Sequence, residues 1–396
     1  MNDIRPLYAF LFHAAYKCGY EDLIIDCSNL QAAFPGPMVS LCSKVLSLRE
    51  DKKSVKLILP KKPSLNRLFF NTNWANIIDP SEFKPSTFKG FTHVPTTRFR
   101  DQDEQGSSVN KIIDAILSSI SDIERRDLAA VEWSINEITD NVLIHSESKI
   151  GGLLQLSAFN TRQKRIEYVV CDAGVGIPNS LKSSLENAKS DVEVLDMSIR
   201  EGVTNGKGAG NGLFGSFQTS STSGGYFNIH SGNASLSFNP NPKIGKRVTN
   251  EKIPFGGNLV VACLDYSVPQ LLENALTFKG EKYVSIDFLE TRYEDDYEDK
   301  IIFRLVEESK TFGTRPAAVP IRNKISYLLK SFENHYQLIV DFNSVPTISS
   351  SYADEVFGKL LLEIGVDDYS KKIVLMNCNS TNRMLVSRAL AQRGYN

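Results

Sequence analysis

The segment RIEYVVCDAGVGIP, residues 165–178, constrains the fold more than any other stretch of the chain. Its first half is rich in β-branched and aromatic residues, which predicts a buried strand that ends at Asp172. Gly174 and Gly176 follow, and because glycine has no Cβ, the backbone there can approach a planar ligand closely. A turn between strand and helix explains the glycines, but not their combination with an acid at the strand end. The pattern therefore favours a binding site.

An amphipathic helix is predicted before this strand, over residues 128–145. Glu137 and Asn141 lie four residues apart and share the face beside its apolar stripe. A polar pair in that position is most often solvated, so this helix alone identifies no site. The stripe itself consists of Leu128, Val131, Ile135, Ile138 and Val142.

A glycine cluster, TNGKGAGNGLFGS, covers residues 204–216 and precedes a predicted helix. Free backbone N–H groups at a glycine-rich helix N-terminus can bind phosphate, and Lys207 adds positive charge. The sequence is no Walker loop, because no GKS or GKT follows at the required spacing. A flexible loop is the alternative explanation.

The other elements of this central block predict an α/β sandwich with a mostly antiparallel sheet. Residues 151–159 and 165–172 pair as strands around a turn, and residues 257–266 form a closing strand. The segment GYFNIHSGNASLSF, residues 225–238, predicts a hairpin, and residues 177–207 show no strand pattern and form a lid.

The order of these motifs resembles the GHKL superfamily of ATP-binding domains over about residues 105–267. A helix with ExxxN is followed by a strand with DxGxGIP, a lid and GxGxGL. The superfamily includes gyrase-type topoisomerases, MutL-type repair proteins, heat-shock chaperones, histidine kinases and anti-sigma serine kinases. NEITDNVLIHS is similar to the anti-sigma kinase version of the helix. The resemblance implies a Bergerat-type sandwich that binds ATP and Mg²⁺.

The resemblance also implies roles for single residues. Asn141 would coordinate Mg²⁺ on the triphosphate, Glu137 would be the general base, and Asp172 would accept from the adenine amino group. The family often places a threonine near the adenine, where this chain has Asn258. Further cofactor-binding positions are Gly174, Gly176 and Ile177 around the base and Lys207, Gly208, Gly210, Asn211, Gly212 and Leu213 around the phosphates, with Asp140 and His145 in support.

The flanking blocks predict two small α/β domains, at residues 1–85 and 280–396, with a linker at 86–104. Each contains an apolar strand that ends in Asp, then a loop, a helix and a second apolar strand, which indicates a divergent repeat with parallel strand pairing. LIVDFNSVPTISSSYADEVFGKLL, residues 338–361, resembles the STAS-like family related to anti-anti-sigma factors. By the repeat, we expect residues 1–85 to be STAS-like as well.

In that family a serine at the start of the next helix is phosphorylated, and Ser350 and Ser351 hold the matching positions. The family's DSSG reads SSSY here, without the Asp and the Gly. Capping of the helix by Ser350 or Ser351 is therefore the favoured explanation, and a phosphoacceptor role is the alternative.

Composition narrows the function classes. A net charge of -1 gives no reason to expect nucleic acid or an anionic membrane as a partner. Six separated cysteines without a CxxC pair argue against zinc and against a disulfide framework. With no apolar segment long enough to span a bilayer, we expect a cytoplasmic protein.

We expect a Mg²⁺-dependent regulatory ATPase whose lid and domains rearrange to control a protein partner. The retained Glu137 favours hydrolysis or serine phosphorylation, because histidine kinases of the superfamily carry Asn at that position. A serine kinase of the partner-switching type, which acts on Ser350, Ser351 or a separate STAS protein, is one alternative. A nucleotide-sensing scaffold in a toxin or phage-defence system is the other. Related modules often form homodimers.

Overall fold

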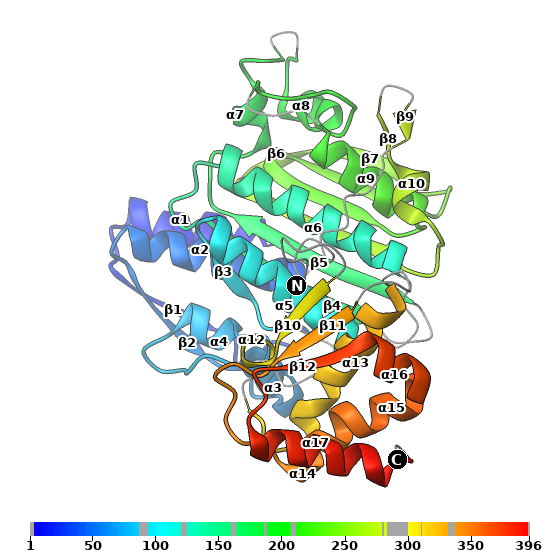
Figure 1. Ribbon diagram of the computed structural model, residues 1–396. Coiled ribbons are helices and arrows are strands. Elements are labelled where there is room, and N and C mark those ends of the chain that lie inside the picture. Colours follow the sequence, from blue (N-terminus) through cyan, green and yellow to red (C-terminus); the bar gives the residue numbers. More distant parts are fainter. Residues whose placement is uncertain are drawn as a thin grey trace. The chain divides into compact units, whose positions relative to one another are not determined.

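The computed structural model describes residues 4–86, 94–119, 125–159, 164–185, 188–206, 211–278, 281–282, 300–309, 311–331 and 337–394 (Figure 1). The chain divides into two compact units. Unit 1 holds residues 1–113 and 126–285, and unit 2 holds residues 114–125 and 286–396.

Unit 1 begins with helices and a short parallel strand pair. These elements are α1 (Arg5–Phe12), the π-helical turn η1 (His13–Lys17), β1 (Asp22–Asp26), α2 (Pro35–Glu50), β2 (Ser54–Ile58), α3 (Pro63–Asn71) and α4 (Trp74–Ile78). The predicted parallel pairing of the two strands is confirmed, with Asp22 opposite Ser54 and Asp26 opposite Ile58.

The rest of unit 1 contains the large sheet and its helices. The elements are β3 (Thr97–Phe99), α5 (Gln102–Ser119), α6 (Arg125–His145), β4 (Gly152–Phe159), β5 (Arg165–Asp172), α7 (Ile177–Leu181), α8 (Asp191–Ser198), α9 (Gly212–Thr222), β6 (Phe227–Asn239), β7 (Gly245–Asp265), α10 (Leu271–Ala275), β8 (Thr277–Phe278) and β9 (Glu281–Lys282). Of α5, residues 102–113 belong to unit 1 and the rest to unit 2, and the first residue of α6 also belongs to unit 2. Five strands form the large sheet in the order β3-β4-β5-β7-β6, and every neighbouring pair is antiparallel. The predicted mixed α/β fold with a mostly antiparallel sheet is confirmed.

The predicted hairpin at residues 225–238 is wrong. One continuous strand, β6, covers most of this segment and pairs with β7, and the chain reverses between Asn239 and Gly245. The Gly232–Asn233 pair, which indicates a hairpin turn, instead marks an irregularity in the register, and Gly232 has a φ of +52°. A β-bulge and a tight turn both favour glycine with positive φ, so the sequence does not separate them.

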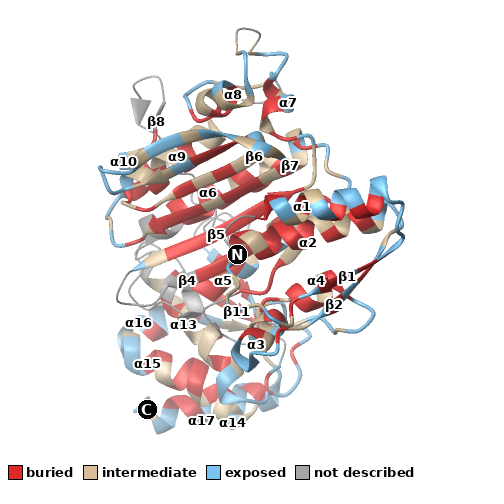
Figure 2. Cartoon of the chain, turned by 180° about the vertical axis from the view of Figure 1, so that it is seen from behind, coloured by how far each residue is buried: buried red, intermediate tan, exposed pale blue. Residues whose placement is uncertain are grey.

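Helices cover both faces of the large sheet (Figures 1 and 2). On one face α6 packs against β5, where the hydroxyls of Ser134 and Tyr168 are 2.7 Å apart. On the other face α2 lies close to β7, because a Cβ on Gly36 would stand 3.2 Å from Val261. Successive residues of a strand point to opposite faces, so even-numbered residues of β5 face α6 and odd-numbered ones face α2.

Residues 1–85 were expected to form a separate domain, but in the structure they belong to unit 1 and share its core. The apolar residues of α1, α2 and α4 form one core with Leu153, Val169, Cys171 and Leu259 of the large sheet. Two strands of five residues provide too little surface to bury a core of their own, so this segment becomes a layer of unit 1. Its STAS-like character stays a prediction.

Unit 2 contains a three-stranded parallel sheet in the order β10-β11-β12. Its elements are β10 (Lys300–Arg304), α12 (Leu305–Glu308), α13 (Arg315–Ser331), β11 (Gln337–Asp341), α14 (Ser350–Ala353), the π-helical turn η2 (Asp354–Gly358), α15 (Lys359–Ile364), α16 (Val366–Lys372), β12 (Ile373–Met376) and α17 (Ser380–Gln392). The predicted alternation of strands and helices is confirmed. The strand expected at residues 283–288 lies outside the described residues. Within the described part of the chain, no helix is both long and apolar enough to cross a bilayer.

Candidate functional site

A cavity of about 400 Å³ in unit 1 brings the motifs of the central block together. It lies between α6, α7, α9 and the ends of β5 and β7 that meet near Asp172. The predicted residues that line it are Glu137, Asn141, Asp172, Ile177, Asn211, Gly212, Leu213 and Asn258, together with the supporting Asp140 and His145.

Asp172 is the buried acid of this cavity, with 1% of its surface exposed. Its Oδ1 accepts from the backbone N–H of Gly174 at 2.8 Å, and its Oδ2 accepts from Nδ2 of Asn258 at 2.9 Å. Burial raises the pKa of Asp172 to about 6, although both hydrogen bonds act in the opposite direction. The carboxylate is thus fixed in orientation and has a higher proton affinity than an exposed aspartate.

Asn258 connects three segments around the cavity. Its Oδ1 accepts from the backbone N–H of Ile177 at 2.9 Å and from the hydroxyl of Ser231 at 2.7 Å. Ser231 stands opposite Asn258 in the pairing of β6 with β7, and the sequence did not identify it as part of the site. Ser231 can be placed beside Asn258 only from the register of β6 against β7, and the predicted hairpin gave a different pairing.

The two glycines after Asp172 contact the protein's own backbone and side chains. A Cβ on Gly174 would stand 1.9 Å from the carbonyl oxygen of Ser146, at the end of α6. Gly176 has a φ of +82°, and a Cβ there would stand 2.9 Å from the Ser231 hydroxyl. Glycine is therefore needed at both positions to pack the loop against α6 and β6. From the sequence, these glycines were predicted to let the backbone approach a ligand, whereas the contacts in the structure are with the protein itself.

Glu137 lies on α6, half-buried, one helical turn before Asn141. Burial raises its pKa to about 7, and the nearby Asp140 contributes in the same direction. A Cβ on Gly212 would stand 2.3 Å from Oε2 of Glu137, so the first residue of α9 lies directly against this carboxylate. A carboxylate with a pKa near neutrality is suited to accept a proton at physiological pH.

Three of the predicted phosphate-binding residues, Lys207, Gly208 and Gly210, lie outside the described residues. Asn205 and Asn211, which lie close to the two ends of that segment in the sequence, both line the cavity. No group of three or more His, Cys, Asp or Glu side chains suited to a metal occurs in the described ranges. Asn141 offers one amide oxygen, and a single side-chain ligand fits Mg²⁺, which keeps water and phosphate oxygens as its other ligands.

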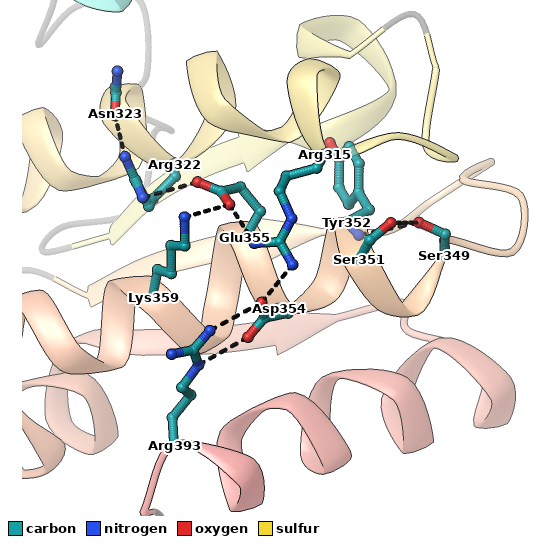
Figure 3. Close-up of polar contacts among 10 residues, drawn as sticks. All are labelled: Arg315, Arg322, Asn323, Ser349, Ser351, Tyr352, Asp354, Glu355, Lys359 and Arg393. Atoms are coloured by element: carbon teal, nitrogen blue, oxygen red, sulfur yellow. Dashed lines mark hydrogen bonds and ion pairs between the residues drawn. The ribbon is translucent and has the colours of Figure 1, made fainter.

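In unit 2 the hydroxyl of Ser349 caps α14, because it accepts from the backbone N–H of Tyr352 at 3.0 Å. The prediction that Ser350 or Ser351 caps this helix is wrong by one or two residues. The hydroxyl of Ser351 lies 2.9 Å from that of Ser349 (Figure 3). Ser350 is exposed. Serine runs give several equivalent capping positions, and the sequence does not rank them.

A charged cluster follows in the same unit, on η2 and the helices beside it (Figure 3). Glu355 is 1% exposed and accepts from Arg315 at 2.8 Å and Arg322 at 2.9 Å, with Lys359 at 2.7 Å. Burial alone would raise the pKa of Glu355, but hydrogen bonds and the nearby positive charges outweigh it and lower that pKa. The cluster joins α13 to η2 and α15.

Residues 317–383 match the family model of a STAS-like domain of unknown function (DUF4325). The match runs from α13 to the start of α17. Unit 2 therefore contains a STAS-like domain, as its sequence indicated. No curated protein matches the chain. The family match says nothing about the cavity of unit 1.

Proposed function

We propose that unit 1 binds ATP with Mg²⁺ in the cavity that Asp172 and Glu137 share, and hydrolyses it to control a protein partner. The observation that supports this most is the joint placement of these two acids. One is held at a strand end by Asn258, and the other lies on α6 beside Asn141, within one cavity of about 400 Å³. That volume is in the range of small-molecule sites.

Asp172 suits the recognition of an adenine amino group. The two carboxylate oxygens carry four lone pairs, and the described contacts are those from the backbone N–H groups of Gly174 and Asn258 and from the Asn258 side chain. The remaining lone pair can accept from an amino group. The hydrogen bonds already present fix the carboxylate, so little side-chain entropy is lost when a ligand binds.

Glu137 and Asn141 suit the triphosphate end of the nucleotide. Asn141 would hold Mg²⁺, which would neutralise charge on the phosphates. Glu137, with a pKa of about 7, accepts a proton from the attacking water or hydroxyl at neutral pH.

The lid carries the proposed control. Its helix α8 is tied to β6, because Asp191 accepts from the backbone N–H of Asn233 at 2.8 Å. It is also tied to β7, because Asp196 accepts from Lys246 at 2.6 Å. The second tie is partly exposed and therefore weak, which leaves α8 free to respond to nucleotide.

A turnover assay on the full chain with product analysis tests this function. We expect free phosphate from the wild type, and at least a hundredfold slower turnover in Glu137→Ala with ATP binding retained. Glu82→Ala, at an exposed position away from the cavity, is the matched control. Turnover that survives Glu137→Ala contradicts the assignment of the base.

Serine phosphorylation is the second candidate, and the exposure of Ser350 favours it. In the same assay with labelled ATP, it predicts label on protein that vanishes in Ser350→Ala and in Glu137→Ala. Free phosphate without labelled protein supports the ATPase.

A further inference from the structure

A second cavity, of about 520 Å³, lies in unit 1 on the face of the large sheet that α2 covers. Its walls come from the start of α1, the loop into α2, α3, α4 and the strands β4 to β7. It shares no lining residue with the cavity of Asp172 and Glu137. The proposed nucleotide site therefore leaves this cavity unexplained.

One wall of the second cavity carries a buried carboxylate. Glu167 is 7% exposed, and Oε2 accepts from the hydroxyl of Tyr226. No described residue donates a hydrogen bond to Oε1 of Glu167. Arg165, two residues back on the same face of β5, donates to the backbone of Gly224 at 3.4 Å instead. Burial raises the pKa of Glu167, as expected for a carboxylate without a cationic partner.

The wall opposite Glu167 is apolar and offers little to an anion. Pro35 and Pro37 occupy the first and third positions of α2, and neither has an N–H to donate. The indole N–H of Trp74 is already donated to Gln155 at 2.8 Å. Phe34 and Leu68 are other apolar residues of this wall. The sheet face that carries Glu167 adds the apolar Phe255, Leu259 and Val261 and the polar Ser157, Asn228 and His230.

The positive charge of Arg5 lies at the far end of the cavity and holds α1 in place. Its guanidinium donates to three backbone carbonyl oxygens, of Gly232 at 3.1 Å, Ile253 at 2.7 Å and Ala234 at 3.0 Å. It also donates to the hydroxyl of Ser235 at 2.8 Å. Cys171 is four residues from Glu167 along β5, a distance of roughly 13 Å. The acceptors of Arg5 lie further along the sheet than the strand residues paired with Cys171, so Arg5 is more distant from Glu167 than that. A cation beside Glu167 therefore meets little repulsion from Arg5.

The cavity also reaches the surface. Phe34 lines it and is itself 49% exposed, so the opening lies beside an aromatic side chain. Exposed aromatic residues at the mouth of a cavity are typical of sites that take apolar ligands.

We propose that this cavity binds a small organic amine with an aromatic or aliphatic body. Its ammonium group donates to Oε1 of Glu167 and to the phenol oxygen of Tyr226, which can accept while its own proton is donated to Glu167. The apolar body packs between the loop into α2 and the side chains of Leu259 and Val261. This ligand gives the buried carboxylate the cationic partner that the described chain does not provide.

Calorimetric titration of the full chain tests the proposal with phenethylamine, 2-phenylethanol and 3-phenylpropionate as probes. The three have similar bodies and a positive, a neutral and a negative end. We expect phenethylamine to bind at least tenfold more tightly than either of the others. Equal binding of all three, or tightest binding of the carboxylate, overturns the proposal. Absence of binding by phenethylamine, benzylamine and tryptamine at millimolar concentration overturns it as well.

Two variants with a matched control locate the binding. Glu167→Gln keeps the size of the side chain and removes its charge, and we expect at least tenfold weaker binding of phenethylamine. Ala33→Trp fills the cavity from the loop into α2, away from Glu167, and we expect it to abolish binding. Glu82→Gln, exposed and outside the cavity, leaves binding unchanged. Unchanged binding in both cavity variants, each with the thermal stability of the wild type, excludes this cavity as the site.

Discussion

Asn258 clamps Asp172 in the cavity of unit 1, with Nδ2 2.9 Å from Oδ2 of the acid. The same side chain holds the start of α7 through the backbone N–H of Ile177. One amide thus sets both the orientation of the buried carboxylate and the entry of the chain into the lid.

The clamp predicts a specific effect of Asn258→Leu. The substitution leaves the N–H of Ile177 with one hydrogen bond and takes a donor from a buried carboxylate, which costs about 1–3 kcal/mol. We expect ATP affinity to fall at least tenfold in calorimetric titration. Asn228→Leu, on the opposite face of the sheet, is the control, and an equal loss of ATP affinity in that variant argues against the clamp.

The raised pKa of Glu137 predicts the pH dependence of turnover. The carboxylate must be deprotonated to accept a proton, so kcat/KM for ATP should rise with pH and level off above about 7. The negative charge of Asp140 contributes to the raised pKa, so Asp140→Asn should move this rise to lower pH. Asp103→Asn, at an exposed position on α5, should leave the profile in place. A profile that does not move in Asp140→Asn contradicts the coupling of the two acids.

Gly174 predicts a stability effect that requires no ligand. An alanine there places its Cβ against the carbonyl of Ser146, and the backbone must shift, at a cost of about 2 kcal/mol. Gly256→Ala is the matched control, because a Cβ there meets no atom within 4 Å. Both tryptophans, Trp74 and Trp133, lie in unit 1, so tryptophan fluorescence during urea unfolding reports on this unit alone. Equal midpoints for the two variants would show that the loop adapts without strain.

The ion pairs of Glu355 are expected to contribute to the stability of unit 2. Glu355→Ala leaves Arg315, Arg322 and Lys359 together without their shared buried anion, and we expect a loss of about 3 kcal/mol. Hydrogen exchange of β11 and α15 measures it, with the exposed Glu307→Ala as the control. Because the pKa of Glu355 is lowered by folding, its contribution is present above about 4.5 and is lost as pH falls through the lower folded value. Exchange that is the same in both variants contradicts this role.

The sequence predicted the elements that carry a strong local signal. The apolar period of α6, the β-branched run of β5 and the glycines after Asp172 all gave the right element in the right place. Long-range packing gave less signal. The apolar faces of α1 and α2 indicate that both helices pack against a core. They do not indicate whether that core belongs to the large sheet or to the pair β1 and β2. The role of Ser231 depends on the register of β6, which no local pattern determines.

The most direct test of the proposed site is calorimetric titration of the full chain with ATP and GTP in the presence of Mg²⁺. Asp172 would accept from the amino group of adenine and would repel the carbonyl oxygen that guanine carries at the same position. We expect ATP to bind at least tenfold more tightly than GTP, and Asp172→Asn to lose ATP binding while its tryptophan-monitored unfolding stays cooperative. ATP affinity that is unchanged in Asp172→Asn, or equal affinities for ATP and GTP, would contradict the assignment of this cavity as an adenine nucleotide site.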